Sequence, residues 1–389
     1  MTTNLSPQAK DKWAEVVACR STPEKIKLMR EFVALCPKHK GTSRLLANVK
    51  QRIVALEQEL EKTKARRRGG GGRSFLIPKE GAGQIVILGP TNVGKSNLVS
   101  SITNAKPEVS SFPFTTRNPV PGMVQYQNIQ FQLVEAPALV EGAAEGQKDG
   151  PRILDLARNS DGLILMVDLT QNPVEQLEML KSELEKAGIL IEDLEGHVEV
   201  QRRSVGSGLQ VVGTGIFVDC TLEDVKNMLL SYKIRSALIK VRGKVKLDDI
   251  EDALFSNPAN KPALIIANKS DAVGSIEVIH RLSKAVKGNM PVLTISCEKK
   301  QGLEGIGENL FQMLKIIRVY CKTPSEKRPS EKPLIMKKGA TVIQVAQEIY
   351  HGLYKNFKYA RIWGVSAKYP GEKVGPEHEM KDGDIIQFI

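Results

Sequence analysis

The hydrophobic positions of residues 1–68 follow the spacing of amphipathic helices. Ser6-Pro7 and Thr22-Pro23 each place a capping hydroxyl just before a proline that suits the first helical position. A third run opens at Gly41-Thr42, and in it apolar residues recur at alternating spacings of three and four. Because this stripe is short, we expect an intramolecular hairpin against Ile26, Met29 and Val33 rather than a long coiled coil. The stripe comprises Leu46, Val49, Ile53, Leu56 and Leu60.

From Gln84 onward, short apolar runs alternate with helical patterns. Several of these runs are continuous stretches of Val, Ile and Leu, which is typical of parallel strands covered on both faces. The alternation of strands and helices predicts an α/β fold with a doubly wound sheet. The predicted strands are 85–88, 129–134, 163–167, 263–267 and 292–295.

Two further modules interrupt or follow this sheet. About 95 residues separate the strands at 163–167 and 263–267, far more than a helical crossover needs. Strand character at 196–218 and 237–241, with helical character at 221–232 and 247–255, predicts an inserted α+β module. Near the carboxyl terminus, strands at 334–336, 359–363 and 385–388 around a helix capped by Thr341 suggest a β-grasp fold.

These patterns divide the chain into consecutive segments. Because four consecutive glycines, Gly69 to Gly72, form a flexible hinge, we expect the hairpin before them to be mechanically separate from the doubly wound domain that follows. The expected segments are a helical hairpin at 1–68, a glycine-rich hinge and linker at 69–83, the doubly wound domain in two parts at 84–190 and 259–320, the inserted module at 191–258, and the carboxyl-terminal domain at 321–389.

The composition fits a multidomain globular protein. The chain of 389 residues is 41% hydrophobic and 26% charged, and no stretch reaches the run of about 18 uncharged apolar residues that a membrane span requires. Residues 1–7 lack the basic start and apolar run of a secretory signal, and the five cysteines include no C-x-x-C pair. We therefore expect a cytoplasmic protein with reduced thiols and no membrane partner.

The positive charge is concentrated at the two ends of the chain. Residues 1–73 hold 17 Lys and Arg against 7 Asp and Glu, and residues 320–389 hold 12 against 8. The net charge of the whole chain is +12, so the central part is close to neutral. Basic appendages on a neutral core favour a polyanionic partner such as nucleic acid, and solvated lysine faces are the alternative.

A phosphate-binding loop follows the first predicted strand. The sequence G-x-x-x-x-G-K-S directly precedes a predicted helix, and in that context backbone N–H groups and the helix amino terminus converge on phosphate oxygens. Lys95 would reach the β- and γ-phosphates, and Ser96 would ligate Mg²⁺. The motif comprises Gly89, Pro90, Thr91, Asn92, Val93, Gly94, Lys95 and Ser96, and Asn97 continues the helix.

A second motif selects the base. Asn268, Lys269 and Asp271 follow the strand at 263–267 and match N-K-x-D. A carboxylate at Asp271 can accept hydrogen bonds from N1–H and the 2-amino group of guanine, whereas adenine offers neither donor and would leave it unpaired. Ser296-Cys297-Glu298, after the next strand, occupies the place of a backbone contact to the guanine oxygen. These residues predict a site for GTP and GDP.

Together these motifs resemble the Obg-branch GTPases, and within them the developmentally regulated GTP-binding proteins and their archaeal relatives. The likeness extends to FPFTT at 112–116, LVEGA at 139–143 and HEMKDGD at 378–384. It implies a P-loop GTPase fold with an S5-like insertion and a carboxyl-terminal TGS domain. It also implies that Thr116 of switch I completes a Mg²⁺ site, and that the protein is a GTPase acting at the ribosome or on structured RNA, as a monomer.

The sequence departs from the family pattern beside the γ-phosphate. Glu135-Ala136-Pro137-Ala138 stands where the family has D-x-P-G, so the longer carboxylate of Glu135 either ligates the metal directly or crowds its site. Ala138 keeps a backbone N–H but loses the freedom of glycine at positive φ. Leu139 stands where many GTPases have a water-orienting glutamine. We therefore expect slow hydrolysis.

Two residues could compensate for these departures. Asn92 occupies a P-loop position at which some related GTPases bind K⁺ beside the bridging oxygen, although most asparagines in turns bond to the local backbone. Arg117 either supplies a positive charge to the site or is a solvated loop side chain.

The leading interpretation is a Mg²⁺-dependent switch with slow GTP hydrolysis, K⁺ stimulation through Asn92, and RNA or the ribosome as partner. The alternative is a GTP-binding regulatory scaffold with negligible turnover that acts through a stabilising protein partner. A P-loop kinase or ATPase is disfavoured by residues 268–271. In the last domain, cations and aromatics interleave at 355–363 and would either stack on bases or pack in the core.

Overall fold

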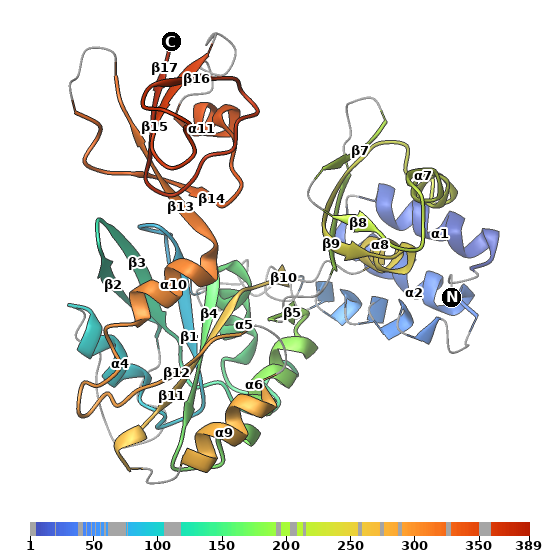
Figure 1. Cartoon of the computed structure of the whole chain (residues 1–389). Helices are drawn as coiled ribbons and strands as arrows, with labels where there is room; N and C mark the ends of the chain where they lie inside the picture. The colour runs from blue at the N-terminus through green and yellow to red at the C-terminus, as the bar shows by residue number, and fades with distance from the viewer. Residues whose placement is uncertain are drawn as a thin grey trace. The chain divides into compact units, whose positions relative to one another are not determined.

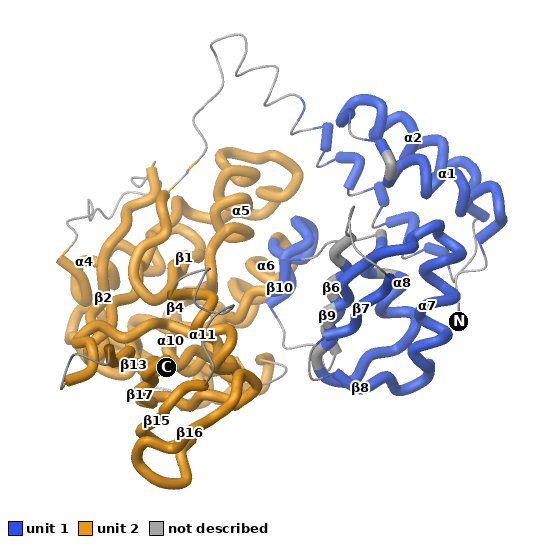
Figure 2. The backbone as a smooth tube through the Cα atoms, turned by 90° about the horizontal axis from the view of Figure 1, so that it is seen from above, with its two compact units in different colours: residues 1–74, 184–260 blue, residues 75–183, 261–389 orange. Residues whose placement is uncertain are grey.

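The computed structural model divides the chain into two compact units, 1–74 with 184–260 and 75–183 with 261–389 (Figure 2). It describes residues 5–19, 21–37, 42–60 (without 44, 48, 51, 55, 58 and 59), 75, 77–104, 118–191, 196–202, 208–212, 215–255, 259–272, 276–286, 290–323, 328–349 and 359–389.

The amino-terminal helices form as their capping residues predict, with one difference. Helix α1 (Pro7–Ala18) begins after Ser6, whose hydroxyl accepts a hydrogen bond from the backbone N–H of Ala9 at 3.2 Å. Helix α2 (Thr22–Leu35) includes Thr22 as its first residue, and Ser21 rather than Thr22 stands at its N-cap. The described residues between 43 and 60 are helical, and Val49 and Ile53 of the predicted stripe are buried.

The inserted module forms a four-stranded sheet with two helices. Strands β6 (Gly196–Arg202) and β7 (Leu209–Val212) flank β9 (Ala237–Val245), which also pairs with β8 (Ile216–Phe217). Helix α7 (Leu222–Ser231) starts with a capping box between Thr221 and Asp224, and α8 (Leu247–Phe255) follows β9. Near the module, β5 (Ile189–Leu190) and β10 (Ala259–Asn260) pair in parallel.

The hairpin and the inserted module share one hydrophobic core. Trp13 and Phe32 of the helices, with ring centroids 4.8 Å apart, belong to the same buried cluster as Tyr232 and Ile239 of the module. The hinge prediction concerned the doubly wound domain, which belongs to the other compact unit, and it stays a prediction. The hydrophobic stripe faces a second partner that lies more than a hundred residues away in the sequence.

The second unit contains the predicted parallel sheet. Its strand order is β12-β11-β4-β1-β3-β2, and every neighbouring pair is parallel except β2 with β3. Its strands are β1 (Gln84–Leu88), β2 (Val120–Tyr126), β3 (Ile129–Glu135), β4 (Gly162–Asp168), β11 (Ala263–Asn268) and β12 (Val292–Thr294). The sequence pattern did not predict β2, because this edge strand is only partly buried and lacks a continuous apolar run.

Helices cover both faces of this sheet. Helices α4 (Lys95–Ile102) and α10 (Ile306–Leu314) lie on one side, and α5 (Gly150–Asn159), α6 (Pro173–Lys186) and α9 (Ile276–Ala285) lie on the other (Figure 1). Strands β1, β4 and β11 are buried along their whole length, as strands between two helical layers should be. The predicted fold class is confirmed.

The carboxyl-terminal sheet begins before residue 321, where the sequence placed the boundary. Strand β13 (Ile316–Cys321) pairs with β14 (Leu334–Lys337) and β17 (Asp384–Phe388), and β15 (Ala360–Trp363) and β16 (Glu372–Val374) complete the sheet. Helix α11 (Val342–Ile349) packs Val342 and Val345 into the core of this domain. Strand β13 directly follows α10, so the two domains adjoin without an intervening loop.

Candidate nucleotide-binding site

The loop between β1 and α4 has the backbone geometry of a phosphate cradle. Gly94, at the N-cap of α4, has a φ of 97°, and Asn92 has a φ of 62°. A Cβ at Gly89 would lie 2.6 Å from the carbonyl oxygen of Met166 on β4. The loop therefore needs glycine for a left-handed turn at one end and for close approach to the sheet at the other.

Lys95 lies folded against the loop that carries it. Its side chain is buried, and Nζ donates hydrogen bonds to the carbonyl oxygens of Gly89 at 3.0 Å and Pro90 at 2.7 Å. Burial lowers the pKa of Lys95 to about 8, and the nearby Glu135 carboxylate acts in the opposite direction. An anion bound in the loop would supply the counter-charge that this ammonium needs.

Ser96 and Glu135 place two oxygen ligands side by side. The hydroxyl of Ser96 donates to Oε1 of Glu135 at 2.5 Å, and the Glu135 side chain is buried at the end of β3. The longer side chain of glutamate thus reaches the serine hydroxyl directly.

Asn268 joins three loops of the site. Its Nδ2 donates to the carbonyl oxygen of Val93 in the P-loop at 2.9 Å, and its Oδ1 accepts from the backbone N–H of Cys297 at 3.1 Å. The side chain is buried, and a Cβ at Gly94 would lie 2.3 Å from Nδ2. This asparagine is therefore a structural bridge that fixes the distance between the P-loop and the base-recognition loops.

The other residues of the predicted base site lie around that bridge. Asp271 is in the short 3₁₀ helix Ser270–Ala272, and a hydrogen bond with Ser296 holds the pKa of the Asp271 carboxyl below its usual range. Burial raises the pKa of the Cys297 thiol to about 12, so this cysteine stays protonated. The three loops after β1, β11 and β12 thus meet at the carboxyl edge of the sheet, where ligands bind in folds of this type.

Two buried carboxylates of this region were not found from the sequence. Asp168, at the end of β4, forms an ion pair with Lys269 at 2.6 Å. Its carboxylate also accepts a hydrogen bond from the hydroxyl of Thr170 at 2.6 Å. Glu183 of α6 accepts from the backbone N–H groups of Gly142 at 3.1 Å and Ala144 at 2.7 Å. An acidic residue that ends a fully apolar strand, as Asp168 does, is a signal that could have been used.

The remaining predicted residues differ in what the structure says of them. Thr116 and Arg117 lie outside the described residues. Leu139 is fully buried and its backbone N–H donates to the carbonyl oxygen of Gly89 at 3.1 Å, so an apolar side chain fills the position of the usual glutamine. Ala138 is partly buried beside it, and Asn92 is exposed.

Comparisons with known proteins identify the family of this chain. A family model described as a 50S ribosome-binding GTPase matches residues 84–194, the carboxyl-terminal region of the same domain matches 206–316, and a TGS domain model matches 317–389. The mouse developmentally-regulated GTP-binding protein 2 is 32% identical over 94% of this chain and 98% of its own. The chain belongs to the family of developmentally regulated GTP-binding proteins. It is a GTP-binding protein of the P-loop GTPase class.

Other relatives in this family include an archaeal protein. An uncharacterised GTP-binding protein of Methanocaldococcus jannaschii is 30% identical over 94% of this chain and 92% of its own. The crystal structure of a GTP-binding protein from Pyrococcus horikoshii matches with 19% identity and a TM-score of 0.44, covering 79% of this chain and 99% of that one. Among the described residues, no helix combines the length and the apolar character needed to cross a membrane.

Proposed function

We propose that this developmentally regulated GTP-binding protein is a Mg²⁺-dependent molecular switch that hydrolyses GTP slowly and acts on the ribosome or on structured RNA. The proposal that the protein binds a nucleotide rests on the buried ammonium group of Lys95. Within the described residues, its hydrogen bonds go to neutral acceptors, the carbonyl oxygens of Gly89 and Pro90. A triphosphate would provide the negative charge at this point.

The chain's own groups would prepare the phosphates for reaction. On GTP binding, Lys95 would exchange its carbonyl partners for oxygens of the β- and γ-phosphates. The backbone N–H groups at the start of α4 would orient the same triphosphate. Hydrolysis forms a bond from a water oxygen to the γ-phosphorus and breaks the bond to the β–γ bridging oxygen. Lys95 is positioned to stabilise the charge that develops on that bridging oxygen.

The oxygen ligands near the P-loop fit a magnesium ion. Ser96 and Glu135 offer a hydroxyl and a carboxylate, the hard donors that Mg²⁺ prefers, and they already touch at 2.5 Å. Thr116 is the third proposed ligand. When bound, Mg²⁺ neutralises charge on the phosphate oxygens.

Turnover is expected to be slow. Leu139 is buried and cannot orient a water molecule, and Ala138 restricts the backbone where relatives have glycine. Asn92 has an exposed side chain on the positive-φ turn of the P-loop. We propose that it assists K⁺ binding beside the bridging oxygen.

The RNA part of the proposal is supported by charge and by family. The two ends of the chain carry its excess of Lys and Arg, and the family model that matches residues 84–194 describes a 50S ribosome-binding GTPase. The phosphodiester backbones of nucleic acids are the partners that such basic ends suit best. A cytoplasmic location fits the five cysteines, which include no C-x-x-C pair, and we expect the protein to act as a monomer.

The second candidate is a GTP-binding scaffold with negligible turnover that acts through a protein partner. The buried Leu139 side chain favours it, since the group that activates water in many GTPases is replaced by an apolar one. The two candidates differ in whether GTP is hydrolysed faster than it dissociates.

Nucleotide specificity tests the base site. GTP and GDP should bind far more tightly than ATP and ADP, and Asp271→Asn should weaken GTP while favouring xanthine nucleotides, whose 2-oxo group suits an amide donor. Fluorescent nucleotide titrations measure both. ATP affinity comparable to that of GTP in the parent protein would overturn the assignment.

Single-turnover hydrolysis in K⁺ and in Na⁺ separates the two candidates. A slow rate that rises in K⁺, falls to the Na⁺ rate in Asn92→Ala, and disappears in Lys95→Ala supports the switch. A rate that is negligible in both salts leaves the scaffold. Equal rates in the two salts would remove the K⁺ role of Asn92.

Binding to purified ribosomal subunits at several salt concentrations tests the RNA part. Deleting the hairpin is unsuitable, because it would expose the core that it shares with the inserted module. Neutralising Lys27 and Lys50, which are exposed on the hairpin, leaves that core intact. The double variant should bind less tightly and with a flatter salt dependence; absence of binding by the parent at low salt would contradict the proposal.

A further inference from the structure

Cationic side chains gather at the edge of the large sheet opposite the P-loop. The parallel strands β1, β4 and β11 begin there, and the P-loop follows the other end of β1. We call this set the amino-edge cluster; it consists of Lys79, Arg158, Lys261 and Lys337.

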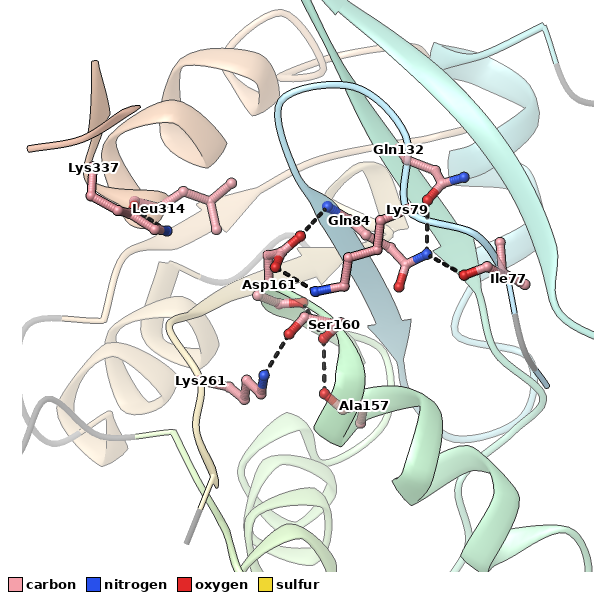
Figure 3. Close-up of polar contacts among 11 residues, drawn as sticks. Ile77, Lys79, Gln84, Gln132, Ala157, Ser160, Asp161, Lys261, Leu314 and Lys337 are labelled. Atoms are coloured by element: carbon pink, nitrogen blue, oxygen red, sulfur yellow. Dashed lines mark hydrogen bonds and ion pairs between the residues drawn. The ribbon is translucent and has the colours of Figure 1, made fainter. Parts of the chain in front are cut away.

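Two of these lysines contact consecutive residues at the start of β4. Nζ of Lys79 pairs with Oδ1 of Asp161 at 2.6 Å, and the other carboxylate oxygen accepts from the backbone N–H of Gln84 at 2.9 Å. Nζ of Lys261 donates to the carbonyl oxygen of Ser160 at 2.5 Å. Figure 3 shows the two ammonium groups approaching Ser160 and Asp161 from two segments of the chain, one before β1 and one before β11.

Lys337 reaches the same edge from the carboxyl-terminal domain. Its Nζ donates to the carbonyl oxygen of Leu314 at 3.2 Å (Figure 3). The Leu314 side chain abuts the strand ends, because a Cβ at Gly83 would lie 2.8 Å from its Cδ1 and 3.9 Å from the Cβ of Asp161. Strand β14 thus brings a further cation to the edge that already carries Lys79 and Lys261.

The four cations lie close enough to influence one another. Among the described residues, Asp161 pairs with Lys79 and acts on Lys261, and Asp155 acts on Arg158. Burial lowers the pKa of Lys261, and the neighbouring cations lower it further while Asp161 opposes them. Like charges held together in a folded chain repel each other, and a polyanion would relieve that repulsion.

A purely structural role explains only part of the arrangement. Ser160 is the C-cap of α5 and Leu314 is the last residue of α10, so Lys261 and Lys337 each complement the negative end of a helix. One lysine at each helix end would satisfy that role. It does not require Lys79 and Arg158 to share the same edge, and an ammonium group carries three donors for further acceptors.

We propose that the amino-edge cluster is a surface that binds the phosphate backbone of structured RNA. This inference rests on the proposed action on RNA and adds the surface that makes the contact. Lysine binds phosphate as a point charge without demanding base identity, which suits a surface that positions the protein on a helix of RNA. Because the P-loop lies at the opposite edge of the sheet, both sites can be occupied together.

The test compares a cluster variant with a matched control. The cluster variant is Lys261→Gln with Lys337→Gln; the control is Lys226→Gln with Lys284→Gln, two lysines exposed on α7 and α9. The probes are a short RNA duplex and purified ribosomal subunits, each over a range of salt. Losing two phosphate contacts should weaken binding about 25- to 60-fold near 0.1 M salt and lower the salt slope by roughly 1.4 to 1.8. The control should match the parent protein.

A third variant distinguishes loss of phosphate contacts from loss of folding, because it is expected to bind RNA more tightly. Asp161→Asn removes a negative charge from the surface while its amide oxygen can still accept from Gln84. Unit charges about 4 Å apart in water interact by roughly 1 kcal/mol, so RNA affinity should rise about fivefold. Loss of folding would lower the fraction of binding-competent protein and so weaken the apparent affinity, the opposite of this gain. GDP affinity should be unchanged in all three variants.

The outcomes separate this inference from the proposed function. If the parent protein binds RNA with a steep salt slope but the cluster variant and Asp161→Asn behave as the control does, the cluster is only surface and the RNA function stands. If the cluster variant binds ribosomal subunits less tightly while its salt slope and its binding to the RNA duplex are unchanged, the surface contacts protein and the inference fails. If the parent protein binds neither probe at low salt, the RNA function itself fails.

Discussion

The bridge made by Asn268 should be needed for the site to hold its shape. Asn268→Ala removes the donor to Val93 and the acceptor for Cys297, both of which are buried main-chain partners. A buried polar group left without a partner costs about 1 to 3 kcal/mol, so the local free energy of opening should fall by at least about 2 kcal/mol. Since 1.4 kcal/mol is a factor of ten, this corresponds to roughly 30-fold faster amide exchange.

Hydrogen exchange measured by mass spectrometry gives the appropriate readout. The chain has two compact units, so a single global unfolding energy would not report on this site alone. Peptides spanning 89–96 and 292–301 should both exchange faster in nucleotide-free Asn268→Ala, and GDP affinity should fall with them. Peptides from the carboxyl-terminal sheet should not change.

Asn309→Ala provides a matched control. Asn309 also donates from Nδ2 to a carbonyl oxygen, that of Gly305 at 2.9 Å, but it is only partly buried, so water can replace the bond. Its effect on exchange should stay below about threefold. If Asn268→Ala exchanged no faster than Asn309→Ala at either segment, the bridge would not hold the loops together and the reasoning would be wrong.

Two further predictions concern the P-loop. Burial lowers the pKa of Lys95 to about 8, and bound phosphate should raise this pKa. The protein should therefore take up a proton when it binds GDP near pH 8, and its GDP affinity should fall by up to about tenfold for each pH unit above 8. Calorimetry in two buffers measures the uptake, and a constant affinity up to about pH 9.5 would contradict it. Gly94→Ala should weaken GDP binding at least about 30-fold, because its φ of 97° is strained for alanine and its Cβ would meet Asn268. Gly146→Ala, with a φ of 104° and no neighbour within 4 Å, should leave GDP titrations nearly unchanged.

The sheet and the P-loop could be predicted because their signals are local. Strands β1, β4 and β11 are continuous apolar runs, and the loop from Gly89 to Ser96 owes its function to backbone groups and to the spacing of two glycines. Strand β2 could not be predicted this way. It is an antiparallel edge strand of half-buried residues, and only its pairing with β3 identifies it.

The organisation of the amino-terminal unit shows a different limit. A glycine run predicts a flexible link between neighbours in sequence, but it says nothing about partners elsewhere in the chain. Trp13 and Phe32 pack in the same core as Tyr232 and Ile239, so the hairpin is completed by a module inserted about two hundred residues later. Hydrophobic periodicity identifies a face that must be buried; it does not identify what buries it.

The polar contacts that complete the site follow the same rule. Lys269 is recognisable from its motif, but its partner Asp168 lies 101 residues away on another strand. Arg318 of β13 donates two hydrogen bonds to the carboxylate of Asp382. Its guanidinium also donates to Gln127 and Asn128 in the turn between β2 and β3. That turn joins β2 to β3, the strand that ends at Glu135. The carboxyl-terminal domain is therefore hydrogen-bonded to the β2–β3 turn of the GTPase domain, and only the folded sheet brings these residues together.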